Sequence, residues 1–324
     1  MRQTTPSTPQ RYVLNFAMAQ PHLVILFYKF TPIAEPGQLR DQLHACCDAR
    51  HLKGRVIIAH EGLNGTLGGT EANVREVVAL LHKDSRFADM EIKESVGTEN
   101  TFPKLSIKVR PEIVTLKADI PLEADTHHNH LSPEQWRNTI ENDPNIVLVD
   151  VRNRYESAVG KFANAVECDI ENFRELPAYM NRLTPLKDRK VLMYCTGGIR
   201  CEKASALFRS HGFDQVYQLH GGIVNYHKEI GTTHWQGECF VFDQPMTVPS
   251  PEPAEDIGRC AHTGAPTIRF VNCLHDPCHV LFLLDEAAEQ ANPSFRLCPK
   301  CLASGLTPDT ADYVGSPARA FSSP

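Results

Sequence analysis

The sequence predicts an α/β protein centred on a parallel sheet, and three observations support this prediction. Between residues 130 and 220, short runs rich in Val, Ile and Leu alternate with stretches of helical periodicity. The region before them has its own strand and helix signals, and five of the eleven cysteines lie in the last 65 residues. We therefore expect a parallel-sheet domain, preceded by a small α+β domain and followed by a Cys-rich module.

The first expected domain covers residues 21–120. Its order of elements, βαββαβ, is that of a ferredoxin-like α+β domain. The dipeptide Asn64-Gly65 is a hairpin-turn signal and predicts a turn between the second and third strands. The expected elements are a strand at 22–30, a helix at 37–52, a strand, turn and strand within 55–69, a helix at 70–84, and strands within 104–116.

The second expected domain covers residues 121–242. Ser132, Pro133 and Gln135 predict a helix start with a capping box, because a serine caps, proline suits the first helical position and Gln three residues after the cap closes the box. The alternation that follows predicts a parallel sheet with helices on both faces. Strands are expected at 145–151, 165–170, 190–195 and 215–219, and helices at 173–183 and 202–212.

The other segments differ in composition. Residues 1–20 are expected to form a disordered leader, 243–258 a Pro-rich acidic linker, 259–305 a Cys-rich module and 306–324 a flexible tail. The chain has no apolar run long enough to span a bilayer and no secretory signal. Many cysteines without an export signal predict a cytoplasmic protein with reduced thiols. The sequence does not indicate an oligomeric state.

The charge of the whole chain is unfavourable for nucleic-acid binding. Its formal net charge is -6, so contact with RNA requires a local basic patch. Residues 150–209 contain eleven Lys and Arg against eight Asp and Glu, an excess of three positive charges. This bias is compatible with a phosphate-binding surface and equally with an ordinary solvated face.

Cys195 is the candidate nucleophile. It stands at the carboxyl end of an expected parallel strand, where open α/β sheets bind ligands. The following helix directs free amides and its positive dipole end towards the loop, and two glycines let the backbone curl around one point. These features lower the pKa of a thiol and activate its sulfur. The expected active loop consists of Thr196, Gly197, Gly198, Ile199, Arg200 and Cys201.

Neighbouring residues have alternative roles. Arg200 is expected either to hold an anionic substrate group or to lower the pKa of Cys195. Cys201 could resolve an oxidised Cys195 as a disulfide, or simply pack against the sheet. Asp150 and Arg152 end the neighbouring strand, and we expect a supporting role for them. His127, His128 and His130 are interpreted as solvated linker residues rather than metal ligands.

The C-terminal cysteines predict a structural zinc site. Cys273-x4-Cys278 and Cys298-x2-Cys301 form two pairs separated by 19 residues, and Cys260 is a possible further ligand. A module this small cannot form a sizeable hydrophobic core, so a bound metal ion is expected to stabilise it. The alternative is that these are reduced cysteines in a loose tail.

Several motifs together resemble a known family. The sequence from Asp150 to Glu156, the Cys195-x4-Arg200 loop and Gly221-Gly222-Ile223 resemble a rhodanese domain. More broadly, the chain is similar to the bacterial tRNA uridine hydroxylase family. The motifs that carry this resemblance are EGLNGT (61–66), HLSPEQW (130–136), FRELP (173–177), YCTGGIRCEKAS (194–205) and GECFVFD (237–243).

The resemblance implies a ferredoxin-like domain, a rhodanese domain and a Cys-rich C-terminus. It implies oxygen-dependent formation of 5-hydroxyuridine at the wobble position of tRNA, recognition of the anticodon loop, and an essential role for Cys195. No flavin or haem motif is present. Two positions depart from the family: Thr263 replaces a cysteine and Pro245 replaces an arginine. The alternatives are a sulfurtransferase that passes persulfide sulfur from Cys195 to an acceptor, and a zinc-dependent RNA-binding module with an inert scaffold.

Overall fold

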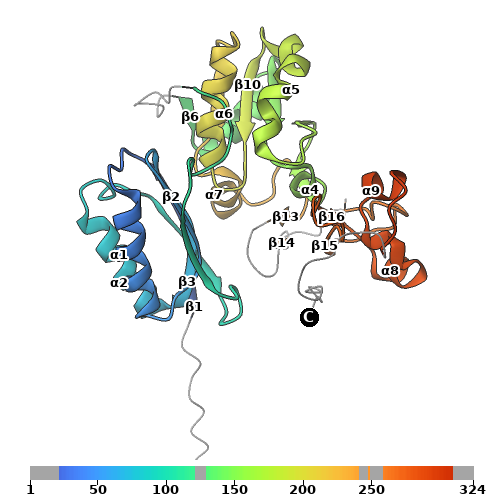
Figure 1. Ribbon diagram of the computed structural model, residues 1–324. Helices are drawn as coiled ribbons and strands as arrows, with labels where there is room; N and C mark the ends of the chain where they lie inside the picture. Colours follow the sequence, from blue (N-terminus) through green and yellow to red (C-terminus); the bar gives the residue numbers. More distant parts are fainter. Residues whose placement is uncertain (1–21, 121–128, 241–246, 249–257, 309–324) are drawn as a thin grey trace, which may run out of the picture.

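A computed structural model describes residues 22–120, 129–240, 247–248 and 258–308 (Figure 1). The expected leader, most of the expected linker and tail, and His127 and His128 lie outside these residues. Within the described ranges, no helix has the length and apolar character needed to cross a membrane.

The N-terminal domain is a five-stranded sheet with the order β4-β1-β3-β2-β5. Ile25 and Phe27 alternate with outward residues along β1 and pack on one face beneath two helices, which cover that face alone (Figure 1). The other face is turned towards the rest of the molecule. The elements are β1 (His22–Phe30), α1 (Pro36–Asp48), β2 (Lys53–Ala59), β3 (Gly62–Thr70), α2 (Glu71–Lys83), β4 (Ile92–Gly97) and β5 (Leu105–Val109).

The ferredoxin-like arrangement is confirmed, because β1, β2, β3 and β4 pair antiparallel in the expected order, but two details are wrong. Asn64-Gly65 lies inside β3, and the turn falls at residues 60–61. Gly65 is needed there because a Cβ would come within 2.9 Å of the Phe27 ring. The sequence also missed β4, a polar edge strand, whereas the strand expected within 104–116 is present as β5, which pairs parallel with β2.

The second domain contains the expected parallel sheet, with the order β6-β11-β10-β7-β9. Helices α5 and α6 cover one face and α3 and α7 the other. The predicted capping box of Ser132 and Gln135 is present. The elements are β6 (His130–Leu131), α3 (Pro133–Asn142), β7 (Ile146–Asp150), α4 (Arg154–Ser157), β8 (Gly160–Phe162), β9 (Val166–Glu167), α5 (Leu176–Leu183), β10 (Lys190–Tyr194), α6 (Ile199–Ser210), β11 (Val216–Leu219), α7 (Gly222–Glu229), β12 (Trp235–Gly237) and β13 (Cys239–Phe240).

The C-terminal module is built from short elements around its cysteines. It joins the second domain through an apolar contact in which the Phe240 and Phe270 rings lie 5.2 Å apart, centroid to centroid, beside Val159. The described elements are β14 (Thr247–Val248), β15 (Phe270–Asn272), β16 (Leu281–Leu283), α8 (Glu286–Ala291) and α9 (Pro299–Ala303).

Candidate active site

Cys195 follows β10 directly, at the carboxyl end of a central strand. The chain turns at Gly198, whose φ of 102° is accessible to glycine, and α6 begins at Ile199. This turn brings the Gly198 N–H within 3.1 Å of the Cys195 Sγ. The sulfur therefore lies at the amino-terminal end of a helix, facing hydrogen-bond donors, as the sequence predicts.

The electrostatics of the loop favour a thiolate at Cys195. Burial alone would raise its pKa. Hydrogen bonds from the Cys201 thiol and from the Arg200 and Gly198 amides, with the Arg200 charge, lower that pKa to about 5. The pKa of Cys201 lies well above its usual value, because this thiol is buried and donates to the negative Cys195. At neutral pH the pair consists of a thiolate and a protonated thiol.

The Gly221-Gly222 motif braces the loop from α7. The Ile223 N–H donates to the Cys195 carbonyl oxygen at 3.0 Å, and the Val224 N–H donates to that of Thr196 at 3.1 Å. A Cβ on Gly222 would lie 2.5 Å from the Thr196 carbonyl oxygen, so only glycine permits this approach. The motif thus fixes the backbone of the cysteine itself.

Arg200 is paired with a residue to which the sequence gave no role. Its guanidinium donates to both carboxylate oxygens of Glu156, at 2.7 Å for Nη2 to Oε1, and the Thr196 hydroxyl donates to the same carboxylate at 3.1 Å. Both Arg200 and Glu156 are buried. Of the two expected roles for Arg200, this geometry favours the electrostatic one, since Glu156 occupies the face that an anion would need.

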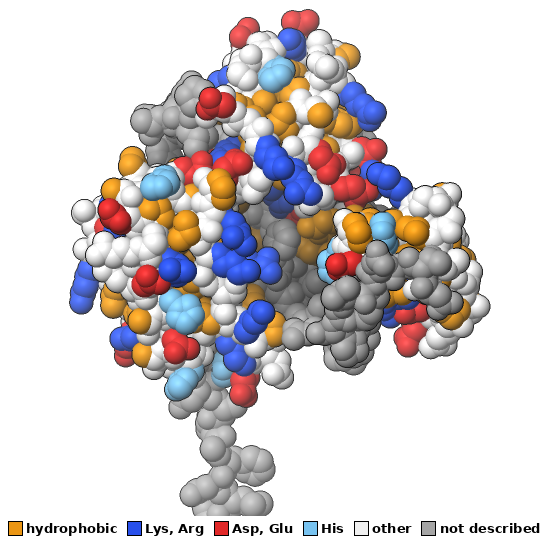
Figure 2. All heavy atoms as spheres, in the orientation of Figure 1, with side chains coloured by type: hydrophobic (Ala, Val, Ile, Leu, Met, Phe, Trp, Pro, Cys, Tyr) orange, Lys and Arg blue, Asp and Glu red, His pale blue; other side chains and the backbone are white. Residues whose placement is uncertain are grey.

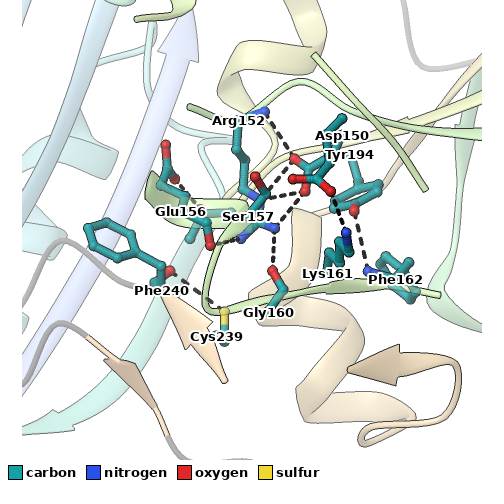
Figure 3. A network of polar contacts seen from close by, with 12 residues as sticks. Asp150, Arg152, Glu156, Ser157, Gly160, Lys161, Phe162, Tyr194, Cys239 and Phe240 are labelled. Carbon is teal, nitrogen blue, oxygen red and sulfur yellow. Dashed lines mark hydrogen bonds and ion pairs between the residues drawn. The ribbon is translucent and has the colours of Figure 1, made fainter. Parts of the chain in front are cut away.

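Asp150 and Arg152 form a second buried pair close to Tyr194 (Figure 3). The Arg152 guanidinium donates to Asp150 Oδ2 and to the Gly160 carbonyl oxygen, both at 2.6 Å. It also lies over the ring of Tyr194, 5.6 Å from the ring centroid. Because Tyr194 immediately precedes Cys195, this pair lies against the end of β10, and its supporting role stays a prediction.

The N-terminal domain covers the active loop. The Lys93 ammonium on β4 donates to the Gly197 carbonyl oxygen at 2.6 Å, and the Leu26 side chain approaches Gly197 so closely that a Cβ there would be 2.8 Å away. The side chain of Tyr28 reaches the same place from β1, its ring 5.4 Å beneath the Lys93 ammonium. Cys195 is completely buried as a result. Sequence reasoning missed these residues, because a pairing over 104 positions leaves no local signal.

Glu202, on α6, is the centre of a buried polar cluster at this interface. It accepts hydrogen bonds from the Tyr28 hydroxyl at 3.2 Å and from Gln218 Nε2 at 3.2 Å. His130 Nε2 lies 3.3 Å from Glu202 Oε1. His130 is therefore not the solvated linker residue that the sequence suggested: it packs against α6 with little exposure.

Lys203 fastens α6 to the N-terminal domain. Its ammonium lies 2.9 Å from Glu61 Oε1, in the turn before β3, and 2.6 Å from Glu112 Oε2, beyond β5. The Lys203 side chain is only 7% exposed. The residues that follow Cys201 are thus domain contacts as well as helix formers.

Four C-terminal cysteines meet as the sequence predicts. The Sγ atoms of Cys273, Cys278, Cys298 and Cys301 all lie within 4.8 Å of one another, and those of Cys278 and Cys298 are 3.8 Å apart. Zinc–sulfur bonds of about 2.3 Å in a tetrahedron require sulfur atoms about 3.8 Å apart. The residues thus fit a metal ion. Cys260 does not belong to this group, so its expected role as a further ligand has no support.

Comparison with known families covers most of the chain. Residues 22–113 match the UPF0176 acylphosphatase like domain, residues 132–229 the rhodanese-like domain, and residues 236–302 the rhodanase C-terminal domain. Fold and loop together therefore define a rhodanese-domain protein with an additional α+β domain and a Cys-rich module.

Similar proteins of known family identify the family within this class. The chain is 39% identical over 274 residues to the tRNA uridine(34) hydroxylase of Onion yellows phytoplasma (strain OY-M), covering 83% of this chain and 88% of the relative. It is 45% identical over 232 residues to that of Legionella pneumophila (strain Lens), covering 70% and 90%, and 40% identical over 268 residues to that of Rhodococcus opacus (strain B4), covering 80% and 94%. The chain belongs to the tRNA uridine(34) hydroxylase family.

Proposed function

We propose that this protein is an enzyme that hydroxylates C5 of the wobble uridine in tRNA, with Cys195 as the reacting residue. The observation that carries this proposal is the thiolate geometry of Cys195, within a chain whose relatives bear the name tRNA uridine(34) hydroxylase. A thiolate is a strong nucleophile and is easily oxidised, so it can either add to the uracil ring or carry an activated oxygen atom.

Molecular oxygen is the proposed oxidant. One of its oxygen atoms forms the new C5 hydroxyl group, and the other leaves as water after taking up two electrons and two protons. Oxidation of a thiolate and a thiol to a disulfide releases two electrons and one proton, and the second proton comes from the solvent. Cys201 is the candidate second thiol, because it is protonated and hydrogen-bonded to Cys195. An external thiol then reduces the disulfide for the next turnover.

The proposal also covers the RNA segment that is bound, the metal ion and the location of the protein. The anticodon loop is the proposed tRNA segment, since enzymes that act on a base read it in unpaired RNA. Zinc is the proposed ion for the four C-terminal cysteines, with a structural role. None of the eleven cysteines forms a disulfide, which supports a reducing, cytoplasmic location.

A second candidate function is sulfur transfer. The Gly198 amide and the α6 terminus would stabilise a persulfide on Cys195 as well as a thiolate. The active loop supports both reactions equally. The N-terminal cover and the similarity to the hydroxylases, which spans 70–83% of the chain, favour the first.

Nucleoside analysis of tRNA separates the two functions. The gene is deleted in its host, and the strain is complemented with the wild type, Cys195→Ser, or Cys46→Ser, a control on α1 outside the active loop. Hydroxylation predicts loss of 5-hydroxyuridine and its derivatives, restored by wild type and Cys46→Ser only. Loss of thionucleosides instead would favour sulfur transfer. Unchanged tRNA in the deletion strain would contradict both.

A further inference from the structure

The uncovered face of the N-terminal sheet carries a row of basic side chains along its β2–β5 edge. In β2 and β5, Val56, Ile58 and Ile107 point into the helix-covered core, so the alternate residues lie on the opposite face. The residues of this basic row, on the strands or directly beside them, are Lys53, Arg55, Lys104, Lys108 and Arg110.

The basic row is unneutralised. Arg55, Lys104, Lys108 and Arg110 are exposed, and within the described part of the chain none of the five is ion-paired with a carboxylate. Several other bases of the same domain are paired, as in Lys29–Asp89, Arg50–Glu76, Arg75–Glu94 and Arg86–Asp84. Figure 2 shows Lys and Arg side chains gathered on this domain where it borders the central hollow. An acidic protein that leaves one such face unpaired presents a site for a polyanion.

The position of the basic row relates it to the active loop. It lies on the same sheet face as Leu26 and Tyr28, which cover the Cys195 loop from β1. Strands β3 and β2 follow β1 in the sheet, so a strand spacing of about 4.8 Å places β2 about 10 Å and β5 about 14 Å from β1. Along the strands, Lys53 and Arg55 are about 6.6 Å apart, as are Lys108 and Arg110, whereas Lys104 and Lys108 are about 13 Å apart. The basic row and the two residues that cover the Cys195 loop therefore lie on one face of the sheet.

We propose that the basic row on β2 and β5 binds the phosphate backbone of the tRNA anticodon arm and aligns it beside the Cys195 loop. That the RNA is tRNA rests on the proposed function. The basic row itself indicates only that the ligand is a polymer of phosphates. The excess of basic residues at 150–209 does not provide this surface as directly, because Arg152, Lys161, Lys190, Arg200 and Lys203 are all ion-paired.

Fluorescence anisotropy of a labelled anticodon stem-loop RNA tests this site with the full-length protein. The triple variant Arg55→Gln, Lys104→Gln and Lys108→Gln removes three charges from the row. The matched control, Lys83→Gln, Arg182→Gln and Lys228→Gln, removes three exposed charges from α2, α5 and α7. We expect Kd to rise at least about tenfold in the first variant, and the slope of log Kd against log salt to fall by about 2. The control should stay within about twofold of the wild type.

Several outcomes would overturn the site. Equal loss in both variants would mean that only net charge matters, and wild-type affinity in the row variant would place the RNA elsewhere. A wild type that fails to bind RNA, or a wild-type dimer that the row variant dissociates in sedimentation, would assign the face to another occupant.

Parallel assays for 5-hydroxyuridine keep this proposal separate from the proposed function. Row-dependent RNA binding without product would retain the site and reject the hydroxylase. Formation of 5-hydroxyuridine together with unchanged RNA binding by the row variant would retain the hydroxylase and reject the site.

Discussion

The Lys93 ammonium lies 2.6 Å from the carbonyl oxygen of Gly197, so a side chain of the N-terminal domain directly contacts the loop that holds Cys195. The Cys195 sulfur is therefore surrounded by two domains rather than one. The first domain supplies the cover and a positive charge, and the second supplies the thiolate and its amides.

The first prediction concerns the Cys195 thiolate. Its pKa is lowered to about 5, so the sulfur is charged at neutral pH and becomes protonated as the pH falls through 5. Any step that needs the thiolate should be constant near pH 7 and slow about tenfold per pH unit below 5. The difference in ultraviolet absorbance between wild type and Cys195→Ser measures the titration. A midpoint near the usual thiol value would refute an activated sulfur.

The second prediction tests the charge of Lys93. Burial lowers the pKa of Lys93, and the Glu91 and Cys195 charges oppose this shift, so by reciprocity the ammonium stabilises the thiolate. Lys93→Met should therefore raise the Cys195 pKa in the same absorbance titration. Lys29→Met is the control, because Lys29 pairs with Asp89 and belongs to the same domain. A midpoint unmoved by Lys93→Met would show that Lys93 only joins the domains.

The third prediction concerns the buried Glu156–Arg200 pair. Glu156→Gln removes the charge that neutralises a buried guanidinium, which typically costs about 3–5 kcal/mol. Urea denaturation should show this loss in the free energy of unfolding. Asp169→Asn provides the control, since Asp169 pairs with Arg154 at a site where both side chains are more than half exposed, and such pairs contribute about 0–1 kcal/mol. Similar effects of the two substitutions would contradict the structure.

The fourth prediction concerns Lys203, which holds the N-terminal domain over the Cys195 loop. Lys203→Met breaks the contacts with Glu61 and Glu112, and hydrogen bonds to charged groups contribute about 1.5–3 kcal/mol each. Transient separation of the domains should become at least about tenfold more frequent, and iodoacetamide should label Cys195 faster by the same factor. Peptide mass spectrometry measures the rate, with Lys228→Met as the control. An unchanged rate in a folded Lys203→Met protein would mean that reagents reach the sulfur by another route.

The fifth prediction concerns the metal. Purified protein should contain one zinc ion per chain, as measured by elemental mass spectrometry, and Cys298→Ser should lose it and melt at a lower temperature. Cys260→Ser should keep the ion, because Cys260 lies outside the cysteine group. Retention of full zinc content by Cys298→Ser, or its loss from Cys260→Ser, would show that the ligands are different.

Local patterns predicted much of this molecule. The strand–cysteine–glycine–helix order placed Cys195, and the spacing of two cysteine pairs predicted their meeting. The same reasoning failed at Asn64-Gly65, because glycine was required by the bulk of Phe27 rather than by a turn. Strand β4 was missed because an edge strand with polar residues on both faces has no clear periodicity.

Contacts between distant segments could not be predicted. Glu156 stands 44 positions from Arg200, and Tyr28 stands 174 positions from Glu202. Each such residue looks locally like an ordinary helix or strand residue, and only the packing of the domains shows what it contacts. For the same reason, the sequence could not predict that the uncovered face of the N-terminal sheet points towards the second domain.

The two carboxylates that hold Lys203 flank the strands of the basic row, since Glu61 follows β2 and Glu112 follows β5. The distance from the basic row to Cys195 is thereby fixed in the folded chain. If the basic row holds RNA as proposed, this fixed distance determines which nucleotide reaches Cys195, so the position of a base along the bound strand contributes to its selection.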